Sequence, residues 1–251
     1  SISFRAGGAI VKTATSPRGV IALPFRLWRI YRDYRSKKTR QLNISGSNYG
    51  RMKLPQIPPR KFPPEISGQE RKALMILYCS LPFRSNGYAI RSHGLLSGLR
   101  KTSWEVIPYT RLGYPWVSNY SSTGSNQEFS QVDEIIYHHL KIPNVQKGYS
   151  NSNDYFAESA MEIESVATAI RPSLIHAASN HLTALPALIA ARRVGIPFIY
   201  EVRGLWEITE ISVNPALEET ELFKFKYDLE SLVAKEADCV IALTNRLRDE
   251  L

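Results

Sequence analysis

The 251-residue chain is 43% hydrophobic and 22% charged, so it is long and apolar enough to bury the core of one large domain or two small ones. This composition excludes wholesale disorder, collagen-like repeats and a disulfide scaffold, and no run of 18 or more apolar residues is present to span a bilayer. The two cysteines, Cys79 and Cys239, lie in apolar runs, which predicts buried free thiols in a reducing compartment and no zinc site.

The net charge of +9 is concentrated near the amino terminus. Residues 1–65 carry 14 Lys and Arg against two acids, a net of +12, whereas the rest of the chain has a net of −3. A basic segment of this kind suits an anionic membrane surface or nucleic acid. Because the opening sequence SISFRAGGAIVKTATS lacks the layout of a signal peptide, we expect a cytoplasmic protein that could lie at the inner face of the membrane.

Residues 19–38 have the periodicity of a basic amphipathic helix. At about 100° per residue, apolar side chains fall within one arc and arginines spread over the opposite side. The arc holds Leu23, Leu27, Ile30, Tyr31 and Tyr34, and the opposite side holds Arg26, Arg29, Arg32 and Arg35. This helix is expected either to bind an anionic membrane surface or to pack on the body of the protein. Nucleic acid is disfavoured, because the arginines are not interleaved with a base-reading motif.

Residues 41–68 contain five prolines, which predict a linker without regular structure. We therefore divide the chain into a basic arm with its linker, residues 1–69, and a domain, residues 70–251.

The domain alternates short apolar runs with segments of helical spacing. Strands are expected at residues 73–79, 104–110, 134–140, 173–178, 197–202 and 238–244. Helices are expected at residues 88–101, 153–170, 184–195 and about 214–237, with an exposed loop at about 113–131. This alternation predicts an α/β fold with a Rossmann-like, doubly wound, mainly parallel sheet. Ligands of such sheets bind at the carboxyl ends of the strands, so the loops that follow the strands form the candidate site.

The first of these loops, residues 80–93, could approach a phosphate. It contains Gly87, leads directly into a helix, and carries Arg84 and Arg91 nearby. It has neither the Walker sequence nor the three-glycine dinucleotide fingerprint. The alternative is an ordinary turn after a strand.

Two later loops carry polar side chains at strand ends. Residues 175–183 include His176 and His181, which could exchange protons or contact hydroxyl groups, or could serve as structural residues. Asn180 in the same loop could orient a polyol. Residues 200–209 combine two carboxylates, an arginine and an indole, which are side chains typical of sites that bind a sugar or an anionic hydroxyl compound. Those side chains are Glu201, Arg203, Trp206 and Glu207.

Taken together, the runs at residues 80–115, 176–209 and 229–251 resemble the amino-terminal half of family-4 glycosyltransferases of the GT-B type. The resemblance implies the acceptor-side domain of a retaining, metal-free enzyme of the hexosyltransferase type. Such an enzyme transfers a sugar from a nucleotide-sugar donor to a saccharide or lipid-linked acceptor, as in polysaccharide biosynthesis, and needs no cofactor besides the donor. Leu251 falls where the family's chain passes to its nucleotide-sugar domain, so that domain is expected to be absent and the fragment alone inactive.

The resemblance also implies site residues. Gly87, Tyr88 and Arg91 are assigned to the donor diphosphate, and His176, His181 and Arg203 to catalysis. The substrate-binding residues are Ser179, Asn180, Glu201, Trp206 and Glu207. We expect Gly87, His176, Asn180, His181, Arg203 and Glu207 to open into one cleft, and no metal site is expected.

The chain departs from the family pattern at two positions. Ala178 stands where many members have the second His of a His-x-His sequence, so that role is vacant or passes to a neighbouring side chain. Residues 201–204, Glu-Val-Arg-Gly, stand where others have a His after the next strand, which leaves Arg203 as the anion-binding candidate. The alternative function is a non-catalytic interaction module that docks on a membrane or a partner subunit.

Overall fold

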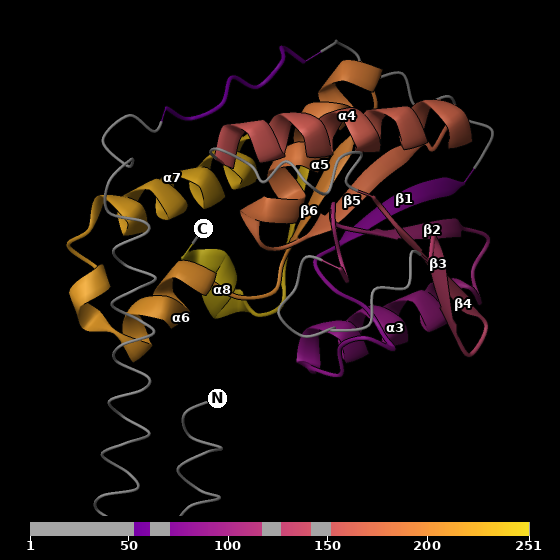
Figure 1. Ribbon diagram of the computed structural model, residues 1–251, viewed down its shortest axis with the longest axis horizontal. Coiled ribbons are helices and arrows are strands. Elements are labelled where there is room, and N and C mark those ends of the chain that lie inside the picture. The colour runs from indigo at the N-terminus through magenta and orange to yellow at the C-terminus, as the bar shows by residue number, and fades with distance from the viewer. Residues whose placement is uncertain (1–52, 61–70, 117–126, 142–151, 251) are drawn as a thin grey trace, which may run out of the picture. The chain divides into compact units, whose positions relative to one another are not determined.

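The computed structural model describes residues 53–60, 71–116, 127–141 and 152–250. The chain divides into two units, Ser1–Lys53 and Leu54–Leu251. The helix predicted at residues 19–38 and most of the proline-rich linker lie outside the described residues, so the basic arm remains a prediction. The second unit contains the elements labelled in Figure 1.

A seven-stranded sheet forms the centre of the second unit, in the order β3-β4-β2-β1-β5-β6-β7. The strands are β1 Lys72–Leu77, β2 Glu105–Thr110, β3 Phe129–Val132, β4 Ile135–His139, β5 Leu174–Ala178, β6 Phe198–Val202 and β7 Cys239–Ala242. Every pairing is parallel except that of β3 with β4, which is antiparallel. The predicted α/β, Rossmann-like, mainly parallel fold is therefore confirmed.

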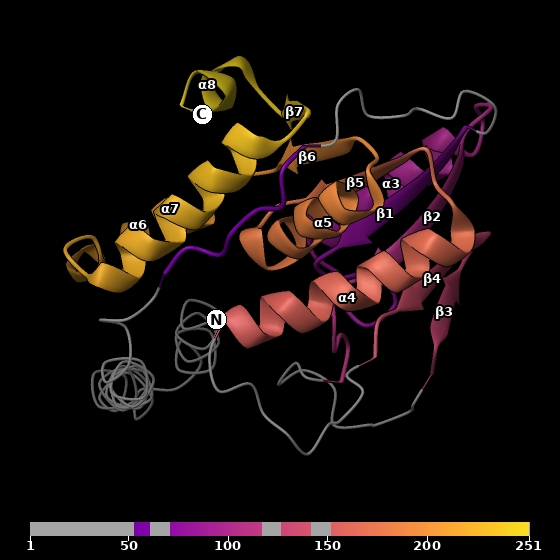
Figure 2. The same cartoon turned by 90° about the horizontal axis from the view of Figure 1, so that it is seen from above.

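Helices cover both faces of this sheet. They are α3 Gly87–Leu99, α4 Ser152–Ile170, α5 His181–Val194, α6 Trp206–Val213, α7 Glu221–Glu236 and α8 Asn245–Asp249, with a 3₁₀ turn, η2, at Pro215–Leu217. Helices α4, α5 and α7 pack side by side on one face, whereas α3 lies on the other (Figures 1 and 2). The direction in which successive strands are added to the sheet reverses at β1, which has β2 on one side and β5 on the other.

Strand β1 shows why a continuous apolar run is needed at the centre of such a sheet. Leu74 and Ile76 pack with the α4, α5 and α7 side, and Met75 and Leu77 pack with Leu96 of α3. These four side chains have no exposed surface. Because successive side chains of a strand point to opposite faces, a strand covered on both faces must be apolar at every position.

Side-chain caps fix where several helices begin. The Asn86 side chain accepts a hydrogen bond from the backbone N–H of Ala89 at the start of α3, and Thr220 does the same for Phe223 at the start of α7. Helix α5 ends at Gly195, whose φ of 85° is readily adopted only by glycine.

Three local expectations are wrong. The helix expected from residue 214 begins instead at Glu221, because Asn214 makes no capping bond and the Asn-Pro signal produces only η2. The loop expected at residues 113–131 includes the start of β3. Cys239 is exposed, because β7 is an edge strand of the described sheet, whereas Cys79 is buried as expected.

Candidate functional site

The three candidate loops lie at one edge of the sheet. Strands β1, β5 and β6 are parallel neighbours, and their register pairs Ala178 with Glu201. The loops that follow these strands therefore leave the same edge, as the sequence predicted. Their side chains nevertheless turn to both faces of the sheet.

Glu201 is the centre of a buried ion cluster on the α3 side. Its carboxylate is 2% exposed and lies 2.8 Å from Nη2 of Arg203 and 3.1 Å from Nε of Arg91. His176 Nε2 lies 3.4 Å away, although it is buried and makes no hydrogen bond. Burial alone would raise the pKa of Glu201, but the polar contacts and charges of His176 and Arg203 hold it at about 2. Glu201 is thus an anion at neutral pH.

Arg203 clamps β6 to α3. Its Nη1 donates to the backbone oxygen of Tyr88 at 3.1 Å and to Ser92 Oγ at 2.6 Å, and its guanidinium lies 4.5 Å over the Tyr88 ring. Its side chain is only 5% exposed. The expectation that this guanidinium opens into a cleft is wrong, because Glu201, two positions earlier on the same face of the strand, pairs with it.

The residues assigned to the donor diphosphate differ in accessibility. Gly87 is exposed at the first position of α3, and a Cβ added there would meet nothing within 4 Å. The Arg91 side chain is 46% exposed. The Tyr88 hydroxyl accepts from Tyr78 N at 2.9 Å and lies 3.5 Å from the oxygen of Ala178, so it is engaged within the protein. Gly87 and Arg91 therefore offer the accessible part of this set.

The polar residues after β5 make internal bonds. Asn180 caps α5 by accepting from Leu182 N at 3.1 Å, and it is 6% exposed. Ser179 has no exposed surface, and its Oγ accepts from Arg203 N at 3.1 Å. The substrate-binding roles of both residues stay predictions.

His181 belongs to a second buried cluster, on the α5 and α7 side. Its Nδ1 lies 2.8 Å from Glu230 Oε1, which also accepts the His181 backbone N–H at 2.7 Å. Glu230 Oε2 accepts the hydroxyl of Tyr200. Sequence analysis did not identify Glu230, because its partners are 49 and 30 positions away and no local motif marks it.

Glu207 adds an acid beside this second cluster. It is 3% exposed, and its Oε2 has no hydrogen-bond partner within the described protein. Burial raises the pKa of Glu207, and the charge of Glu230 adds to the effect. Glu207 therefore holds its proton to a higher pH than an ordinary glutamate does.

The two clusters lie on opposite faces of the sheet. Tyr200 and Glu201 are adjacent on β6, so one reaches Glu230 of α7 and the other reaches the α3 side. The expected single cleft is wrong for His181 and Arg203, whose side chains follow this division. The sequence could predict the shared edge but not the face to which each side chain turns.

An aromatic and cationic group at the same edge joins Trp206, a predicted substrate-binding residue, with Tyr78 and Arg111, which were not identified from the sequence. The ring of Tyr78, which follows β1, lies 5.2 Å from the ring of Trp206. On the same tyrosine, the guanidinium of Arg111 lies 4.8 Å from the ring centroid. Arg111 directly follows β2, so the rule that ligands bind at strand ends could have identified it as a candidate from the sequence.

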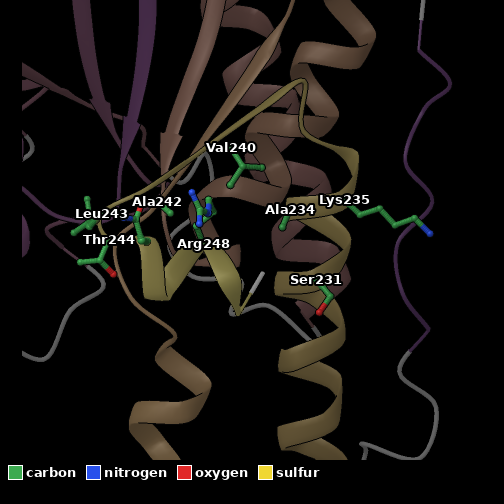
Figure 3. A pocket seen from close by; sticks show the side chains of 9 residues that line it. Ser231, Ala234, Lys235, Val240, Ala242, Leu243, Thr244 and Arg248 are labelled. Carbon is green, nitrogen blue, oxygen red and sulfur yellow. The ribbon is translucent and has the colours of Figure 1, made fainter.

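A separate hollow of about 810 Å³ lies between α7, β7 and α8 (Figure 3). It is lined by Ser231, Ala234, Lys235, Val240, Ala242, Leu243, Thr244, Asn245 and Arg248. None of the predicted site residues lines it, so it is a different feature from the edge described above.

The described part of the chain offers neither a group of metal ligands nor a helix that could span a membrane. There, no three His, Cys, Asp or Glu side chains are grouped so that they could hold a metal ion. No described helix is both long enough and apolar enough to cross a membrane.

Comparison with known families gives one clear match. Residues 86–251 match the family model described as "Glycosyl transferase 4-like domain". No match was found among the curated proteins.

Similar solved structures include two that this chain only partly spans. UDP-GlcNAc 2-epimerase from Methanocaldococcus jannaschii is 15% identical with a TM-score of 0.44, and the alignment covers 71% of this chain and 42% of that one. MnaA from S. aureus in complex with UDP is 16% identical with a TM-score of 0.44, covering 71% and 39%. A sucrose-phosphate synthase fragment from Thermosynechococcus elongatus is 13% identical with a TM-score of 0.43, covering 72% and 80%.

Proposed function

The chain belongs to the glycosyl transferase 4-like family, and from that premise we propose that it forms the acceptor-side half of a retaining glycosyltransferase. The whole enzyme moves a sugar from a nucleotide-sugar donor to a saccharide or lipid-linked acceptor, without a metal. The observation that carries this proposal is that the family match, residues 86–251, contains every residue assigned to the site.

The start of α3 supports the donor side of the proposal. No acidic residue lies in its first turn, Gly87 leaves open space there, and Arg91 is half-exposed one turn further on. The amino end of a helix attracts anions through its free N–H groups and its dipole. These groups would stabilise the diphosphate as it leaves, which is where negative charge develops during transfer.

The Glu201 cluster acts as a positioning device in this scheme. Arg91 is shared between solvent and Glu201, and Arg203 ties Glu201 to α3. The buried anion thus holds Arg91 near the amino end of α3, where its remaining donors can reach a phosphate oxygen.

Gly87→Asp in the natural full-length protein tests the function. The new side chain has room and carries a charge that a helix start tolerates well, but it would repel a diphosphate. Gly94→Asp is the matched control, because Gly94 is exposed on the same helix and also has open space.

The readout is release of nucleoside diphosphate from a panel of nucleotide sugars supplied with mixed acceptors. We expect Gly87→Asp to slow release about tenfold or more and Gly94→Asp to leave it unchanged. Absence of release with every donor, or equal effects of the two variants, would contradict the proposal. The first of these outcomes would favour the interaction module.

A further inference from the structure

Arg111, Tyr78 and Trp206 form a group at the carboxyl edge of the sheet, here named the Arg111 corner. The three residues follow β2, β1 and β6, and the ring of Tyr78 contacts both the guanidinium and the indole. The backbone N–H of Arg111 donates to the oxygen of Leu77 at 2.7 Å. Because this bond continues the pairing of β1 with β2, the position of Arg111 is fixed by the sheet.

In the described part of the chain, the charge of Arg111 is not matched by a carboxylate. No Asp or Glu side chain of the described residues forms an ion pair with it. Its Nε is buried without a hydrogen-bond partner, Nη1 makes a long contact of 3.4 Å to the oxygen of Leu112, and the guanidinium also contacts the Tyr155 hydroxyl. Carboxylates pair with Arg60, Arg91, Arg100, Arg192, Arg193, Arg203 and Arg248, whereas among the described residues Arg71, Arg171 and Arg246 resemble Arg111 in having no such pair.

A second arginine acts on the same place. Burial raises the pKa of both Cys79 and Tyr114, and the charges of Arg84 and Arg111 oppose that rise at each of them. Two cations from different loops therefore converge on the end of β1. Positive charge that is fixed at a strand end attracts anions.

The chemistry of the corner fits one kind of ligand. A guanidinium presents its N–H donors in a planar fork that binds two oxygens of a phosphate or carboxylate together. Aromatic rings beside polar donors are typical of sites that bind sugars. The donor diphosphate already has its place at the start of α3 in the proposed function, so the corner serves the other substrate.

We propose that Arg111, backed by Tyr78 and Trp206, binds a phosphate or carboxylate group of the glycosyl acceptor, and that the acceptor is therefore an anionic saccharide or an anionic lipid-linked saccharide. The identity of the ligand as an acceptor rests on the proposed function. The oxyanion site itself rests on the Arg111 corner.

The test uses the full-length protein with inorganic phosphate, acetate and chloride at equal ionic strength, and it measures the melting temperature. We expect phosphate or acetate to raise the melting temperature over chloride by about 3 °C or more as the site fills. Phosphate alone would identify a phosphorylated acceptor, and acetate an acceptor with a carboxylate. Because phosphate can also bind at the start of α3 in the proposed function, the variants are compared in the Gly87→Asp background, where Arg111→Gln should remove this rise. Arg100→Gln, which alters an arginine that is 51% exposed and paired with Glu134, should keep it.

The inference is overturned if neither anion exceeds chloride, if the rise survives in Arg111→Gln, or if Arg100→Gln loses it equally. If Arg111→Gln fails to fold, Arg111→Lys is used instead, because lysine keeps the charge but lacks the planar fork of donors. A rise in melting temperature as large as that with Arg111 unchanged would then count against the site. Nucleoside diphosphate release is measured separately. A rise that needs Arg111 in a protein that releases none would contradict the proposed function and leave the oxyanion site standing.

Discussion

Replacing Arg203 with methionine should destabilise the domain, because it leaves Glu201 charged and buried without its closest partner. The two side chains are 5% and 2% exposed, and the contact that joins them is 2.8 Å long. Methionine keeps much of the length and the apolar stem of arginine. The variant therefore removes the charge and its hydrogen bonds with little change in packing.

The size of the effect follows from the pKa of Glu201. Its surroundings lower that pKa from 4.5 to about 2. Each unit corresponds to 1.36 kcal/mol, so ionised Glu201 contributes at most about 3 kcal/mol to folding. Because the folded pKa is depressed, this contribution is present above pH 4.5 and is lost as the pH falls toward 2. Breaking buried ion pairs by removing one partner costs about 3–5 kcal/mol, which agrees in size.

Urea unfolding followed by circular dichroism from pH 7 to pH 3 is the assay. We expect Arg203→Met to lower the unfolding free energy by about 3 kcal/mol at pH 7, and the deficit should shrink at pH 3 as Glu201 takes up a proton. The double variant Glu201→Gln, Arg203→Met should be more stable at pH 7 than Arg203→Met alone, since no buried charge remains unpaired. Arg100→Met, which breaks an exposed pair, is the control and should have little effect.

Two results would refute the reasoning. A stability of Arg203→Met equal to that of the unchanged protein at pH 7 would show that Glu201 does not need this partner. A deficit that stays constant down to pH 3 would show that lost packing, and not charge, causes it. Either result would restore Arg203 as a candidate for a purely catalytic role.

Three further predictions concern other parts of the chain. Burial raises the pKa of Glu207, so its protonated form is favoured by folding and stability falls as the pH rises through that pKa; Glu207→Gln should therefore raise the melting temperature at pH 8 more than at pH 5. Burial and the charge of His138 lower the pKa of His139 to about 4, so its imidazole should show no NMR titration above pH 5, and folding stability should fall as the pH drops from 6.5 toward 4. Replacing the four arginines of the segment 19–38 by glutamine should abolish flotation with anionic vesicles, since each basic residue near an anionic surface contributes about 1 kcal/mol; equal flotation would contradict the membrane role.

The sequence predicted the central strands well because their physical requirement is local. A strand covered on both faces needs an unbroken apolar run, and β1 supplies one between Ala73 and Leu77. Strand β3 was missed because it has four residues and two of its side chains are exposed, which resembles a loop. The Asn214-Pro215 pair has the sequence of a helix start, but it produced only one 3₁₀ turn. Helix α7 begins later, where Thr220 Oγ1 accepts a hydrogen bond from the backbone N–H of Phe223.

The candidate site was predictable only as far as the strand-end rule extends. That rule placed the right loops at one edge, and the spacing of Glu201 and Arg203 already puts both on one face of a strand. It could not reveal that Ser92 of α3 accepts from Arg203, or that Glu230 of α7 accepts from His181. These contacts join residues 111 and 49 positions apart, and they exist only because α3 and α7 cover opposite faces.

The division of the buried charges between two faces determines which groups remain for ligands. Glu201 pairs with Arg203 on the α3 side, and Glu230 pairs with His181 on the other side, so neither Arg203 nor His181 is left for a ligand. The accessible cation of the first cluster is Arg91, and Arg111 lies outside both clusters. Since both nucleotide-sugar donors and the proposed acceptors are anionic, two separate cationic positions at one sheet edge would offset their mutual repulsion when they are held together for transfer.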